Sequence, residues 1–401
     1  MESYHDRSGL HAAFRDHVNP GKVDFFEAVA FDAVMGERHG ARFGDVYSDR
    51  RWYNCHANGG VFNLGHRNPT VLAAVRDALD HVDIGNHHLV SGHRAALAER
   101  LSATTGDALP GVVFGVGGGE AVDLAIKVAR AATGRLGVVS AGGGYHGHTG
   151  LALAAGDERY RDPFGPNLPG FAQVPFDDLA ALDAAVDDST AAVLLETIPA
   201  TLGMPLPSPG YLEGVRRICD ERGAELLLDE VQTGLGRTGR IWAYEHHDVL
   251  PDVLVTGKGL SGGIYPITAT LMTRPVHDLF VREPFVHIST FGGAEPGCAA
   301  ALAVLDVIET PGFLERVEAL GRRFEAGFAG APFRLRRRGM FMGLVLDGDD
   351  AGMSATLRLF EHGVFAIYAN NDPQVLQFLP PLTLDDDEAD EIIAIVRATL
   401  G

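Results

Sequence analysis

Short apolar runs, each followed by glycine or by charged and amide side chains, recur through the middle of the chain. Residues 112–114, 191–195, 225–228 and 253–256 are such runs. Short and nearly continuous apolar runs are typical of strands that are buried on both faces of an α/β sheet. Ligands of these sheets bind beyond the carboxyl ends of the strands. The pattern therefore predicts an α/β fold whose functional edge carries the residues that follow each run.

The last quarter of the chain has a different pattern, with periodic apolar positions in longer segments. These periods predict helices at residues 312–328, 351–362 and 386–400 and strands at 334–338 and 342–346. We expect this part to form a smaller unit beside the main sheet, because its elements do not continue the alternation of buried strands and helices.

Two of the apolar runs deliver an acid and an amine to the same sheet edge. One run ends in Asp229, with Gln232 close behind it, and the next is followed by Lys258 between two glycines. These glycines leave the backbone open on both sides of Lys258, so a planar ring can approach it closely. Only Lys22 and Lys127 are further lysines of this chain. A lysine that can form a Schiff base and an acid that can pair with a pyridinium nitrogen predict a pyridoxal phosphate site.

A glycine-rich turn is the candidate for the phosphate end of this site. Residues 115–119 are Gly-Val-Gly-Gly-Gly, and they lead into apolar positions with helical spacing. The start of a helix presents free N–H groups and the positive end of the helix dipole, and both favour phosphate. A Rossmann dinucleotide site is the competing interpretation, but Glu120 stands at the sixth position, where that motif needs Gly or Ala. We therefore expect the turn to bind the cofactor phosphate.

The motifs around these residues resemble those of the class III aminotransferases. This family contains pyridoxal phosphate enzymes of fold type I, including acetylornithine, ornithine, GABA and other ω-amino transaminases. The similarity extends from N-L-G-H at 63–66 to F-L-P-P-L at 378–382, and D-E-V-Q-T-G-L-G-R-T-G at 229–239 is its most specific part. It implies a large domain with a mostly parallel central sheet at residues 56–305, and a smaller α+β domain made of residues 1–55 and 306–401.

The resemblance also implies a role for each matched residue. Lys258 corresponds to the lysine that bonds to the cofactor and then acts as general acid and base, and Asp229 to the acid that keeps the pyridine nitrogen protonated. Thr290 corresponds to a hydroxyl that reaches the phosphate in the neighbouring subunit, which implies a homodimer with a shared active site. The other implied cofactor contacts are Gln232 at the phenolate oxygen, Gly118 and Gly119 at the phosphate, Tyr145 on the ring face, and Glu196 at a strand end near the cofactor.

The substrate positions depart from the ornithine and acetylornithine enzymes. His148 stands in place of an arginine that binds the substrate carboxylate, and Gly59 in place of a tyrosine used for ornithine. Thr201 and Gln377 replace both partners of an acid–arginine gate, and losing both leaves no buried charge unpaired. We expect a neutral, enlarged pocket for an amine other than ornithine or N-acetylornithine, such as an amino sugar or a secondary-metabolite amine. A purely structural role is the alternative for His148.

Two questions remain open from the sequence. Arg237, Arg336, Arg337 and Arg338 are all candidates to hold the carboxylate of a 2-oxo acid co-substrate. The reaction class also has alternatives, because the same cofactor, lysine and acid serve isomerases and elimination enzymes of this fold. A further alternative to a transaminase for another amine is an acetylornithine or diamine transaminase with altered carboxylate binding.

Composition narrows the range of partners and compartments. The chain has 401 residues and a formal net charge of −20, which argues against nucleic acid or an anionic membrane as a partner. No apolar run approaches the roughly 18–20 residues of a membrane span, and the first residues lack the regions of a signal peptide, so we expect a cytoplasmic enzyme. Cys55, Cys219 and Cys298 lie far apart, and the paired histidines have no ligand cluster beside them, so no metal site is expected.

Overall fold

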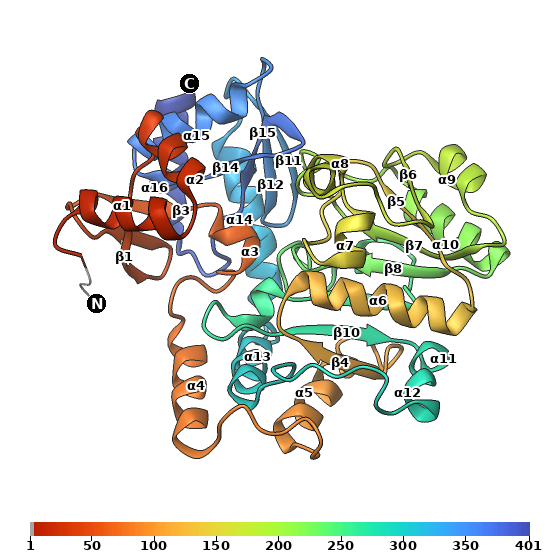
Figure 1. Ribbon diagram of the computed structural model, residues 1–401. Helices are drawn as coiled ribbons and strands as arrows, with labels where there is room; N and C mark the ends of the chain where they lie inside the picture. The colour runs from red at the N-terminus through yellow and green to blue at the C-terminus, as the bar shows by residue number, and fades with distance from the viewer. Residues whose placement is uncertain (1–3) are drawn as a thin grey trace.

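The computed structural model describes residues 4–401, and a seven-stranded sheet lies at the centre of its larger part (Figure 1). Its strands follow the order β4-β10-β9-β8-β7-β5-β6. Only β10 is antiparallel to its neighbours in this sheet, so the expected mostly parallel sheet is confirmed. The strands are β4 (Gly111–Gly115), β5 (Gly137–Ala141), β6 (Phe171–Val174), β7 (Thr190–Glu196), β8 (Glu225–Asp229), β9 (Val253–Thr256) and β10 (Thr268–Met272).

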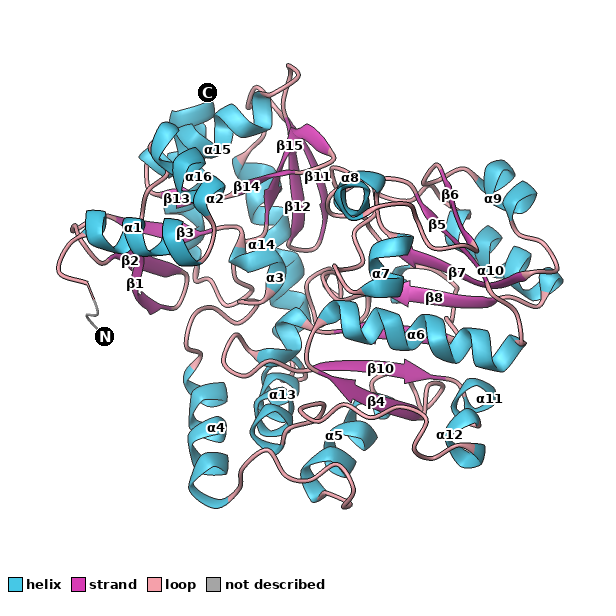
Figure 2. Ribbon diagram, in the orientation of Figure 1, coloured by secondary structure: helices cyan, strands magenta, loops and turns pink. Residues whose placement is uncertain are grey.

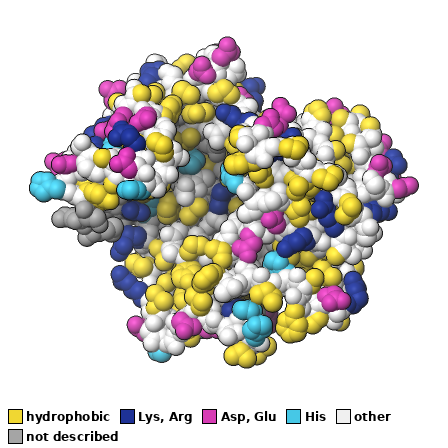
Figure 3. All heavy atoms as spheres, in the orientation of Figure 1, with side chains coloured by type: hydrophobic (Ala, Val, Ile, Leu, Met, Phe, Trp, Pro, Cys, Tyr) yellow, Lys and Arg dark blue, Asp and Glu magenta, His cyan; other side chains and the backbone are white. Residues whose placement is uncertain are grey.

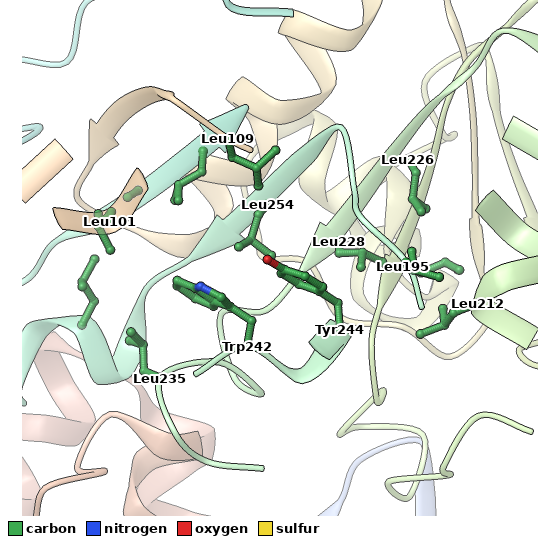
Figure 4. Packing of buried hydrophobic residues seen from close by; sticks show 14 of the residues in the cluster. Leu101, Leu109, Leu195, Leu212, Leu226, Leu228, Leu235, Trp242, Tyr244 and Leu254 are labelled. Carbon is green, nitrogen blue, oxygen red and sulfur yellow. The ribbon is translucent and has the colours of Figure 1, made fainter. Parts of the chain in front are cut away.

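Successive residues of each central strand face two different cores, which explains why the strands are apolar without alternation. Leu227 of β8 packs beneath α6 (Gly118–Thr133). Leu226 and Leu228 face the opposite side of the sheet, where Trp242 lies in the same cluster (Figure 4). The helices of that second side are α4 (Pro69–His81), α5 (Gly92–Ala103), α9 (Leu179–Ala185), α10 (Tyr211–Arg222) and α13 (Glu295–Ile308).

Two four-stranded sheets form the smaller part of the molecule, at the upper left of Figure 2. The first consists of β1 (Met35–His39), β2 (Arg42–Asp45), β3 (Arg51–Asn54) and β13 (Val364–Phe365), and the second of β11 (Arg334–Arg338), β12 (Phe341–Val345), β15 (Asp372–Phe378) and β14 (Ile367–Ala369). Because β3 and β13 pair in parallel, the beginning and the end of the chain lie in one unit. The domain boundaries proposed from the sequence, after residues 55 and 305, stay a prediction.

The elements predicted for the last quarter of the chain are all present, with small differences at their ends. The strand at 334–338 and the helix α16 (Asp386–Leu400) have the predicted bounds. β12 begins and ends one residue earlier than predicted, and α15 (Ala351–Glu361) ends one residue earlier. α14 (Phe313–Gly327) is one residue shorter at each end, because Gly312 adopts φ 88° and precedes the helix as its cap.

The remaining helices are short or lie at the periphery of the molecule. They are α1 (Arg7–His17), α2 (Pro20–Ala28), α3 (Ala57–Gly60), α7 (Gly150–Ala155), α8 (Glu158–Arg161), α11 (Arg274–His277) and α12 (Leu279–Arg282), with 3-10 turns at Asp162–Phe164, Ala243–His246 and Lys258–Ser261. In residues 4–401 no single helix is long and apolar enough to cross a membrane; α13 and α14 meet that criterion only jointly, across a bend of 71°.

Candidate active site

A cavity of about 380 Å³ lies where β7, β8 and β9 end at the carboxyl edge of the large sheet. Glu196 and Asp229 are the last residues of β7 and β8, and Lys258 follows β9 closely. These three side chains line the cavity together with Gly118, Gly119, Tyr145 and Gln232. The space-filling view shows a hollow between the smaller part and the larger part of the molecule (Figure 3). The fold thus brings the predicted lysine, acids and glycines together in one cavity.

Lys258 lies in an unusual backbone conformation at the centre of this site. Its φ is 43°, in the left-handed region that non-glycine residues seldom adopt, and such strain is common at functional sites. Nζ donates a hydrogen bond to Gln232 Oε1 at 3.0 Å. Burial lowers the pKa of the Lys258 amine, while the charges of Asp229 and Glu196 oppose this shift. A lowered pKa increases the fraction of neutral amine, which is the nucleophilic form.

Asp229 has a buried partner to which the sequence interpretation gave no role. His146 Nδ1 donates to Asp229 Oδ2 at 2.9 Å, and the Val231 N–H donates to Oδ1 at 3.1 Å. Although burial opposes protonation of His146, its hydrogen bond to Asp229 and the nearby carboxylates raise its pKa. His146 Nε2 is also buried and has no hydrogen-bond partner in the described part of the chain. The only signal in the sequence is the position of His146 directly after Tyr145.

Glu196 combines a structural contact with an altered acidity. Its Oε1 accepts a hydrogen bond from the backbone N–H of Tyr145 at 2.9 Å, which fixes the loop that carries the tyrosine ring. Burial raises the pKa of Glu196 to about 7, with a further contribution from Asp229; His146 and Lys258 act in the opposite direction. The carboxyl group is therefore able to change its charge near neutral pH.

The start of α6 supplies free donors at the other end of the cavity. The helix begins at Gly118, and Gly117 caps it without any side-chain hydrogen bond, so the first N–H groups of the helix remain available. Thr268 of β10 also lines the cavity, and its buried hydroxyl has no hydrogen-bond partner within residues 4–401. A Cβ at Gly119 would lie 2.8 Å from Thr149 Oγ1, so a larger residue there would have to displace the Thr149 side chain. These free donors fit a phosphate group; the sequence interpretation did not identify Thr268.

The four predicted substrate positions surround this cavity and are not among the residues that line it. Thr201 Oγ1 donates to the backbone oxygen of Gly143 at 3.0 Å, whereas Gln377 Oε1 accepts from Gln232 Nε2 at 3.3 Å. The two positions thus have separate hydrogen-bond partners. Gly59 has φ 66°, and a Cβ on it would lie 3.3 Å from Lys258 Cε.

His148 lies on the outer side of Tyr145. Its exposed ring packs edge-to-face against Tyr145, with a centroid distance of 5.4 Å, and against Tyr160, at 5.6 Å. The third pair of this aromatic cluster, Tyr145 and Tyr160, is also 5.4 Å apart and nearly perpendicular. His148 therefore supports the ring of Tyr145 by packing, and its contact with a substrate stays a prediction.

The arginines proposed for the co-substrate carboxylate are engaged away from the cavity. Arg237 is fully buried and donates to Asn63 Oδ1 at 2.6 Å and to the backbone oxygen of Pro380 at 2.6 Å. Arg336 donates to the backbone oxygen of Gly203, and Arg337 forms ion pairs with two glutamates of α14. Arg338 lines a separate groove. No arginine of residues 4–401 lines the cavity, and the role of the four candidate arginines toward a co-substrate carboxylate stays a prediction.

Thr290 lies on the surface, outside the cavity of its own chain. It belongs to a segment between α12 and α13 that carries several exposed apolar side chains, namely Phe285, Val286, Ile288 and Phe291. Arg94 connects this segment to the loop before α5, because its Nε donates to the Gly293 oxygen at 2.8 Å and its Nη1 donates to the Asn86 oxygen at 3.1 Å. That loop carries the exposed Leu89 and Val90.

Comparison with known proteins agrees with this geometry. A family model described as Aminotransferase class-III matches residues 27–400. An uncharacterized aminotransferase of Archaeoglobus fulgidus is 51% identical over 95% of this chain and 91% of that protein. The crystal structure of ornithine aminotransferase from Toxoplasma gondii is similar with a TM-score of 0.89 and 27% identity, covering 99% of this chain and 96% of that one. Taurine:2-oxoglutarate aminotransferase from Bifidobacterium kashiwanohense, in complex with PLP and glutamate, has a TM-score of 0.86 and 25% identity over 92% of each chain.

Proposed function

Because the chain belongs to the class-III aminotransferase family, we propose that it transfers an amino group between an amino-acid donor and an aldehyde or ketone acceptor, with pyridoxal phosphate bound at Lys258. One observation carries this proposal: Lys258, Asp229 and the free start of α6 lie around a single cavity. An amine, an acid and a phosphate-binding turn are the three groups that this cofactor needs from a protein.

The residues present fit pyridoxal phosphate at each of its ends. The N–H groups of Gly118 and Gly119 and the free hydroxyl of Thr268 are available for the phosphate. Asp229 provides the anion for the pyridine nitrogen, and Tyr145 provides an aromatic wall. When bound, the cofactor withdraws electrons from the bonds of the substrate carbon that carries the amine.

The side chains of this protein position the groups and move the proton. His146 orients Asp229 by its hydrogen bond to Oδ2 and leaves Oδ1 to the Val231 N–H. Lys258 anchors the cofactor through its amine and then moves a proton to or from the amine-bearing carbon of the substrate. Burial and the lowered pKa of Lys258 favour the neutral amine that both tasks require.

We further propose that the preferred amine is neither ornithine nor N-acetylornithine. No arginine lines the cavity in the described chain, so a substrate carboxylate lacks a bidentate partner there. Gly59 leaves the space beside Lys258 Cε open, and Gln377 contributes a neutral amide. An amino sugar or a secondary-metabolite amine suits such a pocket better than an α-amino acid with two charged ends. A 2-oxo acid is the proposed co-substrate.

The proposed enzyme is a homodimer with a shared active site. The exposed apolar side chains around Thr290 and those of the neighbouring loop, Leu89 and Val90, form a surface that is typical of protein interfaces. Thr290 does not line the cavity of its own chain, which supports a role in the site of a second copy.

The test is a half-reaction with a single amine and no 2-oxo acid. A transaminase should release at most one carbonyl product per site and then stop, because turnover would need a 2-oxo acid to accept the amino group. Lys258→Ala should abolish this product, whereas Lys127→Ala, which changes an exposed lysine of α6, should retain it. Continued turnover with the amine alone would refute transamination and favour an isomerase or an elimination enzyme. A screen of about twenty amines then ranks the donors. Ornithine or N-acetylornithine as the best donor would refute the neutral pocket.

A further inference from the structure

Gln377 carries a buried amide from the smaller part of the molecule to the active-site lysine. It lies on β15 between Gly343 of β12 and Ile367 of β14, and only 6% of its surface is exposed. A buried amide is unfavourable unless it finds hydrogen-bond partners. Gln377 Oε1 accepts from Gln232 Nε2 at 3.3 Å, and Gln232 Oε1 accepts from Lys258 Nζ at 3.0 Å. The three side chains thus form a continuous chain of hydrogen bonds.

This chain determines which end of the Gln232 amide faces the lysine. A glutamine amide has one accepting oxygen and one donating nitrogen, whereas a lysine ammonium only donates. Because Lys258 only donates, the oxygen of Gln232 faces it, and the nitrogen of Gln232 is left to donate to the oxygen of Gln377. Rotating the Gln232 amide by half a turn while Gln377 stays in place would set a donor against Lys258 and two oxygens against each other. The bond to Gln377 therefore stabilises the orientation that the lysine requires.

We infer that Gln377 is a positioning residue for Lys258 and acts on it through the amide of Gln232. The inference rests on the proposed function for the catalytic role of Lys258, but the hydrogen bonds themselves need no bound cofactor. An arginine at position 377 has donors only, and it would favour the opposite orientation of Gln232. Gln377 thus has two roles. It gives the proposed substrate pocket a neutral side chain, and it orients the amide of Gln232 beside the amine of Lys258.

The charged and titratable groups around Lys258 come from three other segments. Burial lowers the pKa of Lys258, and Asp229 at the end of β8 and Glu196 at the end of β7 oppose this shift. His56, which precedes α3, stays neutral because burial and the charge of Lys258 lower its pKa to about 4. Against this background the oxygen of Gln232 is a neutral acceptor that stabilises the charged amine by a hydrogen bond. Removing the hydrogen bond between Gln377 and Gln232 should therefore lower the pKa of Lys258 further.

The test follows the reactivity of Lys258 with acetic anhydride in the cofactor-free protein as a function of pH. Only a neutral amine reacts, and peptide mapping separates Lys258 from Lys22 and Lys127, which serve as internal references. Gln377→Met keeps the length of the side chain and removes the accepting oxygen. We expect Lys258 to react about 3- to 10-fold faster in this variant below its titration midpoint. Gln374→Met, on the exposed position of the same strand, should leave the rate unchanged.

A second substitution shows whether the effect passes through Gln232. In a Gln232→Met background, Gln377→Met should have no additional effect on the rate. If the two effects add, or if Gln377→Met alone leaves the rate unchanged, the inference is overturned. Gln377→Glu keeps an accepting oxygen and should not speed the reaction; a faster reaction in this variant would also contradict the inference. Borohydride trapping of pyridoxal phosphate on wild-type Lys258 tests the proposed function separately, because it reports attachment whatever the orientation of Gln232.

Discussion

The substitution Gly59→Ala should slow catalysis by more than its loss of folding free energy can explain. Gly59 lies beside the side chain of Lys258, and a Cβ on it would lie 3.3 Å from Lys258 Cε and 3.7 Å from the Gln232 amide. Carbon atoms prefer a separation of about 3.5–4.0 Å, so Lys258 must move by a few tenths of an ångström. That movement acts directly on the 3.0 Å hydrogen bond between Lys258 and Gln232. A misplacement of about 1 Å at a reacting group costs on the order of 100-fold in rate, so a shift of a few tenths of an ångström should slow turnover roughly 4- to 10-fold.

The backbone adds a second effect, which a control variant separates from the first. Gly59 has φ 66°, and alanine in the left-handed region costs about 1–2 kcal/mol. Gly106 has φ 63°, and a Cβ on it would meet no atom within 4 Å. Gly59→Ala and Gly106→Ala should therefore lose similar amounts of folding free energy, while only the change at Gly59 affects Lys258.

The comparison needs two measurements on each variant. Denaturant unfolding gives the loss of folding free energy, and the single-turnover half-reaction gives the rate of the chemical step. The expected result is a similar destabilisation of both variants, with the rate reduced only in Gly59→Ala. Equal rates in the two variants would refute the argument that the bare backbone at Gly59 leaves the lysine free to react.

Three further predictions concern the acids and the partner subunit. Asp229→Asn should still trap the cofactor covalently, but its turnover should fall more than about tenfold, which is a barrier change of about 1.4 kcal/mol. The reason is that an amide does not keep the pyridine nitrogen protonated. A smaller loss of turnover would contradict the role of Asp229. The unfolding free energy of the wild type, compared with that of Glu196→Gln, should fall as pH rises from about 4.5 to about 7. The reason is that the folded protein binds the Glu196 proton more tightly than the unfolded chain does. Unfolding curves measured across this pH range without such a fall would contradict the raised pKa. Equal mixing of Lys258→Ala with Thr290→Ala subunits should restore about one quarter of wild-type activity, since half of the dimers then hold one intact site; activity no higher than in either parent would exclude a shared site.

The sequence was most informative where local pattern and chemistry coincide. The apolar runs before Asp229 and Lys258 predicted β8 and β9, because a strand that is buried on both faces is a nearly continuous apolar run in the sequence. The glycine turn likewise predicted a helix start, and α6 begins at Gly118. These features depend on residues that are neighbours in the chain, so their geometry follows from a short stretch of sequence.

The parts that sequence could not predict depend on contacts between distant segments. His146 has no distinguishing pattern, and its importance follows only from its burial against Asp229. The bond from Gln377 to Gln232 joins strand β15 of the smaller part to the turn that follows β8 of the large sheet. Arg237 stands in the most specific motif of the chain, and its partners are backbone oxygens and Asn63. Which polar group each of these side chains meets is decided by the packing of whole elements.

The parallel pairing of β3 with β13 has a consequence for how the chain folds during synthesis. Val364 and Phe365 of β13 complete the edge of a sheet whose other strands end at Asn54, so roughly 310 residues separate the two halves of that sheet. At about 5–20 residues per second, β3 waits on the order of 15 to 60 s for its partner on the ribosome. The seven strands of the large sheet leave the exit tunnel during this interval, because they lie between residues 111 and 272. The nascent N-terminal segment therefore exposes an open strand edge until β13 is synthesised, and such an edge can pair with the wrong strand.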